Sequence, residues 1–305
     1  MQHYTLILAT LLSLLVPMKS WGGDFQKGFD AYSIGDYTTA LKKWTPLAEQ
    51  GDVNAQYVLG IMYDFGEGLL QDYKTALKWY TLSAEQGHAP AQSFIGVMYY
   101  DGKGVLQDYK TAVKWFTLSA EQGHAPAQYN LGVMYKDGLG VIQDYKEAVK
   151  WFTLSAEQGD AAAQLNLGYM YSEGRGILQN YKEAVKWYTL SAEQGHAAAQ
   201  FNLGNMYKKG QGVLQDYKEA VRLYTLSAEQ GHAFAQLNLG FSYATGQGVL
   251  KNEVYAHMWW NIVASNGNER AKLNRDIVTE KMTPSQIEKA QDLARECFAK
   301  NYKGC

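Results

Sequence analysis

Apolar residues recur along this chain with the period of amphipathic helices. The segment DYKEAVKWFTLSAEQG at 144–159 spaces them mostly three and four residues apart, and AQYNLGVMY at 127–135 is a second segment of this kind. The two-residue alternation typical of half-buried strands is absent from the sequence. The pattern therefore predicts an all-α protein with two kinds of helix.

Both segments return at a fixed interval of 36 residues. The tetrapeptide AEQG occurs at 48, 84, 120, 156, 192 and 228, and a degenerate copy, ASNG, occurs at 264. A fixed period of this length is typical of solenoids, in which each unit packs only against its neighbours. We therefore expect each unit to contain a first helix, a loop and a second helix.

Glycines mark the ends of these predicted helices. The glycine of AEQG is expected to end the second helix in a left-handed conformation. A GxG pair in each unit, first at 66–68 and last at 246–248, is expected to form the loop between the two helices. A phosphate-binding loop is excluded there, because no third glycine completes GxGxxG and no strand precedes it.

A further glycine lies inside each first helix, at 60, 96, 132, 168, 204 and 240. Glycine in a helix interior costs about 0.5–1 kcal/mol relative to alanine. Its repetition suggests that a second helix crosses there without room for a side chain. We expect contact between the two backbones, with small residues of the second helix as partners: Ala76, Ala112, Ala148, Ala184 and Ala220.

The repeated string A-Q-x-x-L-G-x-M-Y-x-x-G-x-G-V-x-x-D-Y-x-x-A-x-x-W-[YF], followed by AEQG, resembles the Sel-1-like repeat family over residues 24–267. This family is a branch of the tetratricopeptide superfamily. The resemblance implies an all-α, right-handed superhelical solenoid of stacked antiparallel helix pairs, with the first helices lining its concave face. The first unit, AYSIGDYTTALKKW at 31–44, lacks the GxG insertion and resembles an ordinary tetratricopeptide turn.

These patterns predict three regions. Residues 1–22 are expected to be a signal peptide, residues 23–267 seven helix pairs (one tetratricopeptide-like and six Sel-1-like), and residues 268–305 a C-terminal helical cap. In the cap, Thr283, Pro284 and Gln286 match the start of a helix with a capping box. Such a cap covers the apolar face that the last repeat would otherwise expose.

The N-terminal segment bears on localisation. TLILATLLSLLV at 5–16 has the length of a signal-peptide core, and Ser20, Gly22 and Gly23 are small residues suited to cleavage. An N-terminal membrane anchor is the alternative, because MQHYT contains no Lys or Arg. Removal of the signal would leave no segment apolar enough for stable membrane insertion. We expect an exported protein, periplasmic or secreted, of the secreted bacterial type.

Charge and cysteine content narrow the choice of partners. The net charge of −2 over 305 residues offers no broad basic surface, so no nucleic-acid partner is expected. The two cysteines, Cys297 and Cys305, could pair in an exported protein and tie down the last turn. No motif indicates a cofactor.

Histidine follows the AEQG glycine in four units, at 88, 124, 196 and 232, whereas Asp52 and Asp160 occupy the same place in two others. Both residue types can cap the next helix, so we expect His to serve as an interchangeable cap. A catalytic role would not tolerate the exchange. Adjacent helices lie about 8–10 Å apart, too far for His residues of neighbouring units to share a zinc ion.

A row of asparagines is the main candidate site: Asn130, Asn166, Asn202 and Asn238, with Val58 and Phe94 in the equivalent places. In tetratricopeptide proteins an Asn at this position commonly projects into the groove and bonds a bound peptide. An amide both donates and accepts, so it can hold an extended backbone without reading its sequence. The alternative is that each Asn bonds the adjacent helix.

Variable positions on the first helix extend this candidate site. Most neighbouring positions are nearly fixed, whereas the residue type at two positions changes from unit to unit. The change reflects either adaptation to a partner or drift on a solvated surface. The site residues predicted at these positions are Tyr169, Asn205, Lys136 and Lys208.

The sequence favours a non-enzymatic scaffold that binds a peptide segment or protein loop on its concave face. One alternative is a cell-wall-related enzyme or binder. Cysteine-rich relatives of the family have been linked to penicillin binding and β-lactam hydrolysis, and the spacing of Cys297 and Cys305 resembles their disulfide spacing. A second alternative is a secreted effector that contacts a host protein.

Overall fold

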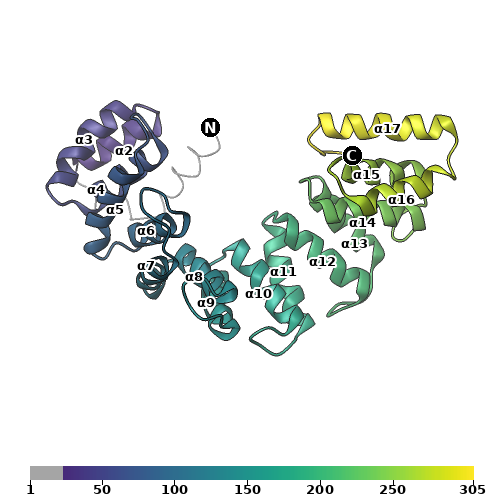
Figure 1. Cartoon of the computed structure of the whole chain (residues 1–305), viewed down its shortest axis with the longest axis horizontal. Coiled ribbons are helices and arrows are strands. Elements are labelled where there is room, and N and C mark those ends of the chain that lie inside the picture. The colour runs from purple at the N-terminus through teal and green to yellow at the C-terminus, as the bar shows by residue number, and fades with distance from the viewer. Residues whose placement is uncertain (1–22) are drawn as a thin grey trace. The chain divides into compact units, whose positions relative to one another are not determined.

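The computed structural model describes residues 23–305, so the predicted signal peptide and its cleavage site lie outside the described residues. All regular secondary structure in this range is α-helical (Figure 1). The helices are α2 (Gly23–Ser33), α3 (Tyr37–Glu49), α4 (Val53–Phe65), α5 (Tyr73–Glu85), α6 (Ala89–Asp101), α7 (Tyr109–Glu121), α8 (Ala125–Asp137), α9 (Tyr145–Glu157), α10 (Ala161–Glu173), α11 (Tyr181–Glu193), α12 (Ala197–Lys209), α13 (Tyr217–Ala228), α14 (Ala233–Thr245), α15 (Glu253–Ser265), α16 (Glu269–Thr279) and α17 (Pro284–Ala299).

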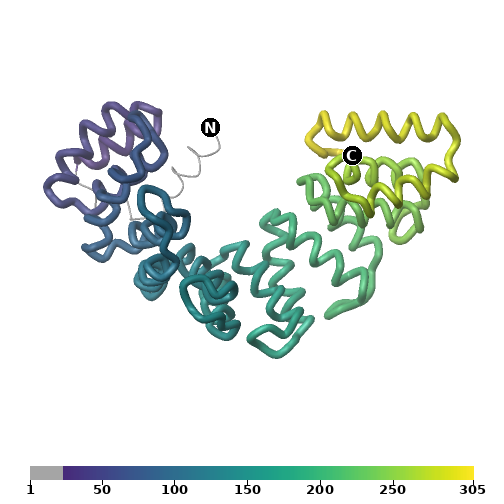
Figure 2. The backbone as a smooth tube through the Cα atoms, in the orientation of Figure 1, coloured from purple at the N-terminus to yellow at the C-terminus, as the bar shows by residue number. Residues whose placement is uncertain are grey.

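The chain divides into two compact units, the first ending at Gln143 and the second spanning Asp144–Cys305. Unit 1 contains α2–α8 and unit 2 contains α9–α17. Inside each unit, helices that follow one another in sequence pack together as antiparallel hairpins, as the backbone trace in Figure 2 shows. The predicted all-α architecture of sequential helix pairs is confirmed, whereas the handedness of a superhelix stays a prediction.

The glycine inside each first helix makes room for an aromatic ring. A Cβ atom on Gly168 would lie 2.7 Å from ring atom Cδ1 of Tyr188, on the second helix of the same pair. The expectation of contact between backbones was therefore wrong in most pairs: the predicted small partners are buried, but the group nearest to the glycine is a ring 20 residues further on. The same relationship holds for Gly60 with Tyr80, Gly96 with Phe116, Gly204 with Tyr224 and Gly240 with Trp260. Only at Gly204, among the glycines so described, does a backbone atom of a predicted partner, the Ala220 carbonyl oxygen, lie 3.3 Å from the Cβ position.

Buried amides and hydroxyls join successive helix pairs and explain the motifs AEQG and AQ. In unit 1, the Gln92 amide donates to the Ala84 carbonyl at 3.2 Å, and its oxygen accepts from the Gln122 amide at 2.7 Å. The Ser119 hydroxyl donates to the Ala89 carbonyl at 2.6 Å. Gln92 and Ser119 are buried, so their bonds remove the penalty of unpaired polar atoms. The repeated residues therefore fix the register between neighbouring pairs.

The C-terminal helices close unit 2. Helix α17 begins with the predicted capping box, in which the Gln286 side chain accepts from the Thr283 backbone at 2.9 Å, and it packs against α15. The predicted disulfide between Cys297 and Cys305 is present. We propose that α16 and α17 act as the cap of the repeat array.

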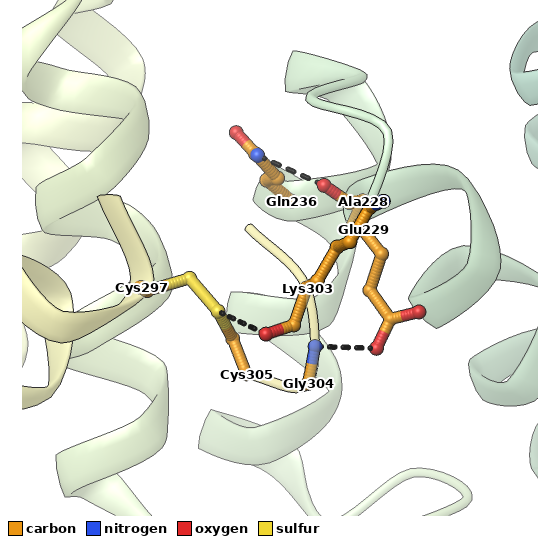
Figure 3. The surroundings of a disulfide bond; sticks show 7 residues. All are labelled: Ala228, Glu229, Gln236, Cys297, Lys303, Gly304 and Cys305. Carbon is orange, nitrogen blue, oxygen red and sulfur yellow. Dashed lines mark hydrogen bonds between the residues drawn. A yellow bond between two sulfur atoms is a disulfide. The ribbon is translucent and has the colours of Figure 1, made fainter. Parts of the chain in front are cut away.

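The disulfide holds more than the last turn. Beyond α17 the chain turns back, and the Gly304 backbone donates to the Glu229 carboxylate at 3.1 Å, at the joint between α13 and α14 (Figure 3). The Tyr302 ring lies beside Gly231 in the same joint. The tail is thus fastened to the joint between α13 and α14 as well as to α17.

Candidate protein-binding surface

A cavity of about 290 Å³ lies in unit 1 between the first helices α6 and α8. Phe116 of α7 contributes to it, and this is the ring that Gly96 accommodates. The lining is mostly apolar, and Asn130 is one of its polar members. The lining residues are Val97, Tyr100, Asp101, Phe116, Tyr129, Asn130, Val133 and Met134.

A second recess of about 190 Å³ adjoins this cavity and shares Val97 and Asn130 with it. It lies over α4, α6 and α8, and its other lining residues are Tyr57, Pro90, Ser93, Phe94, His124 and Pro126. Phe94 occupies the place that Asn holds in later units, and its ring stacks on Tyr80 with the centroids 5.2 Å apart. Asn130 therefore lies between two largely apolar recesses, as suits a group that positions a peptide backbone between two buried side chains.

Unit 2 contains a cavity of about 290 Å³ in the equivalent place, between α10 and α12. Seven of its residues lie 72 positions, or two repeats, after residues of the unit 1 cavity: Tyr169, Ser172, Glu173, Tyr188, Asn202, Asn205 and Met206. Polar side chains replace three apolar or aromatic ones, because Ser172, Tyr188 and Asn205 stand where unit 1 has Tyr100, Phe116 and Val133. The two cavities thus share a position but differ in chemistry.

Hydrogen-bonded side chains line the unit 2 cavity. The Tyr188 hydroxyl lies 3.3 Å from the Ser172 hydroxyl, and Asn202 also bonds it. Burial raises the pKa of Tyr188 to about 12, so its hydroxyl stays protonated at neutral pH. The cavity can therefore both donate and accept hydrogen bonds.

The remaining asparagines of the row, Asn166 and Asn238, form hydrogen bonds within unit 2. The Asn166 amide donates to the Ala162 carbonyl of its own helix at 2.9 Å. The Asn238 amide donates to the Asn205 side-chain oxygen at 3.3 Å, and the Tyr224 hydroxyl donates to the same oxygen at 2.7 Å. The alternative of bonding to an adjacent helix thus describes Asn238 and also Asn202, which bonds Tyr188 of α11, while Asn130 and Asn202 line cavities.

The variable residues have different surroundings. Tyr169 lines the unit 2 cavity, and the Arg175 guanidinium lies 5.4 Å from the centre of its ring. Lys136 forms an ion pair with Asp137 at 3.4 Å. Lys208 is half-buried, and its pKa is lowered by burial first and by Lys209 and Arg270 next. The structure thus brings Tyr169, Asn202 and Asn205 together around one cavity.

The histidines precede helices as expected, but most of their side chains form no capping hydrogen bond with the helix backbone. The Asp52 and Asp160 carboxylates accept from backbone N–H groups at 2.8 and 2.6 Å, whereas only His232 among the four histidines makes such a bond. The expectation of interchangeable caps was wrong for His88, because its ring packs edge-on against Tyr57 and its Nδ1 atom is buried without a hydrogen-bond partner. His124 and His196 make no cap bond either.

Across residues 23–305, no three side chains of His, Cys, Asp or Glu come close enough together to hold a metal ion. In the same range, none of the helices has both the length and the apolar character needed to span a membrane.

The cavity floors were missed by the sequence analysis. Phe116 and Asp101 line the unit 1 cavity and Tyr188 and Glu173 the unit 2 cavity, and none of the four was among the predicted site residues. The signal that could have identified them is the glycine 20 residues earlier, because a ring that fills that gap lies between two neighbouring first helices.

The helix pairs and their repeated cavities define the chain as an α-helical repeat protein. The Sel1 repeat model matches it six times in succession, at residues 53–88, 89–124, 125–160, 161–196, 197–232 and 233–268. The chain belongs to the Sel1 repeat family.

Two solved structures illustrate the likeness. The protein c5321, a protective antigen of uropathogenic Escherichia coli strains with an SLR fold, is 34% identical, with a TM-score of 0.62 over 92% of this chain and 69% of that one. A Sel1 repeat protein from Oxalobacter formigenes is 32% identical, with a TM-score of 0.72 over 80% of this chain and 97% of that one. A search of curated proteins found no match.

Proposed function

We propose that this chain is a non-enzymatic scaffold that binds a peptide segment or protein loop along its first helices. Sel1 repeat proteins are generally protein-interaction scaffolds and are typically non-catalytic. The observation that carries the proposal is the recurrence of one cavity, 72 residues apart, at the same place between first helices. Recesses that recur along the repeat suit an extended partner better than a single small substrate.

The asparagines supply the polar part of this surface. We propose that Asn130 and Asn202 bond the partner's backbone, because each lies at a cavity, and that Asn166 and Asn238 contribute less, because neither is among the residues that line these cavities. Four further residues complete the proposed contact set: Tyr169, Asn205, Lys136 and Lys208.

We also propose that the protein works outside the cytoplasm. Two observations are compatible with export: the disulfide between Cys297 and Cys305, and the finding that no helix in residues 23–305 could span a membrane. Disulfides persist in oxidising compartments such as the periplasm or the cell exterior. Whether the partner is a bacterial or a host protein is left to the experiment.

Site-directed cross-linking tests the function. A photo-reactive amino acid at Val133 or Tyr169 should label one partner reproducibly, and the same amino acid at Lys289 on α17 should not. The affinity of that partner should then fall about five- to tenfold on Asn130→Ala or Asn202→Ala and less on Asn166→Ala, because a net hydrogen bond contributes about 1 kcal/mol. Equal affinities for all three variants would contradict the proposal.

The cell-wall alternative has its own assay. The disulfide fits that resemblance, but it fastens the tail to α17 and to the joint between α13 and α14. Purified protein should leave nitrocefin intact. If the protein hydrolysed nitrocefin, and a single substitution in a cavity abolished this hydrolysis, the proposed function would be that of an enzyme and not of a scaffold.

A further inference from the structure

A third cavity lies in unit 2 among α14, α15 and α16, with Asn274 at its α16 wall. Its volume is about 230 Å³, and every residue that lines it lies 72 positions after a residue of the cavity between α10 and α12. The lining residues are Phe241, Ala244, Lys251, Glu253, Trp260, Asn274, Ile277, Val278 and Lys281. The site therefore continues the repeat beyond residue 268, where the match to the Sel1 repeat model ends.

Asn274 extends the asparagine row by one member. It follows Asn238 by 36 residues, and α16 begins 36 residues after α14. As Asp52 does in α4 and Asp160 in α10, Asn268 caps α16 three residues ahead of its first buried alanine by accepting from the Ala271 backbone at 2.9 Å. The string A-x-x-N, which recurs at the 36-residue interval, marks this register in the sequence.

The walls of the cavity are apolar. The rings of Phe241 and Trp260 meet edge to face with their centroids 5.3 Å apart, and Ile277 and Val278 face the cavity from α16. The indole N–H of Trp260 already donates to the Leu237 carbonyl at 3.2 Å, so the ring presents carbon to the cavity. A wall of this kind suits one aromatic or branched aliphatic side chain.

One polar group in the cavity is unsatisfied. The Nδ2 atom of Asn274 is buried and makes no hydrogen bond to any residue that the structure describes. A buried donor without an acceptor is unfavourable, and an entering carbonyl oxygen would relieve it. Asn274 thus differs from Asn166 and Asn238, whose amides already have acceptors.

The rim of the cavity carries excess positive charge. Lys251 pairs with Glu253 at 2.8 Å, and the pKa of Glu253 is lowered mainly by this bond and further by the charge of Lys281. Arg270 places its guanidinium 5.4 Å from the centre of the Phe241 ring. With Glu253 neutralised by Lys251, the charges of Lys281 and Arg270 remain to attract anionic groups.

We infer that this cavity binds an aromatic or branched aliphatic side chain from an acidic segment of a partner protein. The side chain fills the space between Phe241 and Trp260, a backbone carbonyl accepts from Asn274, and flanking carboxylates meet Lys281 and Arg270. The inference rests on the proposed scaffold function and names the chemistry of the segment that one of its recesses takes.

Peptide binding tests the inference directly. The probe is a fluorescein-labelled heptapeptide, GDEFDEG, compared with a copy that has Ala for Phe and with the basic copy GKKFKKG, by fluorescence polarisation of the purified protein. The acidic peptide should bind at least about fivefold more tightly than either copy, because only it fills the cavity and matches the rim charge. Its affinity should fall as salt rises, since the charged rim is exposed.

Variants locate the binding. Ala244→Phe fills the cavity and should abolish binding, while Asn274→Leu keeps the volume but removes the donor and should weaken binding about three- to tenfold. Lys281→Glu should weaken binding and flatten the salt dependence, whereas Lys289→Glu, the same charge change on α17, should leave it unchanged. Circular dichroism melts verify that each variant folds.

Equal binding of the three peptides, or equal effects of Lys281→Glu and Lys289→Glu, would overturn the inference. Either result leaves the scaffold function standing if a cross-linked partner still loses affinity on Asn130→Ala or Asn202→Ala. Loss of that partner's binding on Asn274→Leu supports the inference in the natural complex.

Discussion

The ring of Tyr188 occupies the space that a side chain on Gly168 would need, and a Cβ atom there would lie 2.7 Å from ring atom Cδ1. Gly168→Ala therefore has two opposing effects on stability. Helix propensity favours alanine by about 1 kcal/mol, whereas overpacking costs about 1–3 kcal/mol. We expect a net loss of about 1–2 kcal/mol in the free energy of unfolding, measured by urea denaturation. Gly23→Ala is the control, because nothing lies within 4 Å of that site. If Gly168→Ala and Gly23→Ala had the same free energy of unfolding, the Tyr188 ring would have to move aside without cost.

The second glycine of each GxG loop permits stacking between pairs. Gly176 and Gly195 both have left-handed backbones, with φ of 71° and 86°. A Cβ atom on Gly176 would collide with the Tyr145 carbonyl of the preceding pair, whereas nothing lies near Gly195. Gly195→Ala should cost about 1–2 kcal/mol of backbone strain, and Gly176→Ala at least about 1 kcal/mol more from the collision. Thermal melts of both variants measure the difference, and equal melting temperatures would rule out a contribution from stacking.

These glycines illustrate which features of the fold can be predicted from the sequence. The 36-residue register, the helix ends and the capping box at Thr283 followed from local rules, because turn chemistry and capping depend on neighbouring residues. A glycine inside a helix reports only that something passes closely. Whether a ring or a backbone does so depends on how the side chain of the opposite helix is directed, which is decided by tertiary packing.

The candidate site was predicted less completely. The asparagine row was visible in the sequence, but which of its members lie at cavities, as Asn130 and Asn202 do, depends on what neighbouring helices supply. Cavities arise where adjacent first helices fail to fill the space between them, and no single repeat contains that information.

The tail offers a test of its attachment. Replacing Cys297 and Cys305 by serine opens a short loop, and the chain-entropy account assigns such a crosslink up to about 2–3 kcal/mol. Hydrogen exchange should rise in α17 and at the joint around Glu229, because the Gly304 bond is lost with the crosslink. Glu229→Ala should reproduce the change at the joint alone, and Glu229→Gln, which still offers an oxygen acceptor, should not. Unchanged exchange at the joint would show that the tail is not fastened there.

Histidine burial makes the stability of unit 1 depend on pH. Burial lowers the pKa of His88 and His124 to about 4, with the charge of His124 adding to the shift at His88. The ordinary value is about 6.5, so between pH 6.5 and 4 the unfolded chain binds more protons than the folded one. Stability is therefore full above pH 6.5 and is lost as the pH falls towards 4. We expect a loss of roughly 1–2 kcal/mol per histidine between pH 7.5 and 5, measured by urea denaturation.

The chain itself supplies the matched replacement for these histidines. Aspartate at the same place in two other units caps its helix, as Asp52 does by accepting from the Ala55 backbone at 2.8 Å. The double variant His88→Asp and His124→Asp should therefore gain about 1 kcal/mol per cap at pH 7.5. It should also lose the histidine part of the pH dependence, since an aspartate with its usual pKa near 3.9 stays charged at pH 5. A wild-type stability that is flat between pH 7.5 and 5, or a variant that declines in parallel with it, would show that the two imidazoles are not held neutral by burial.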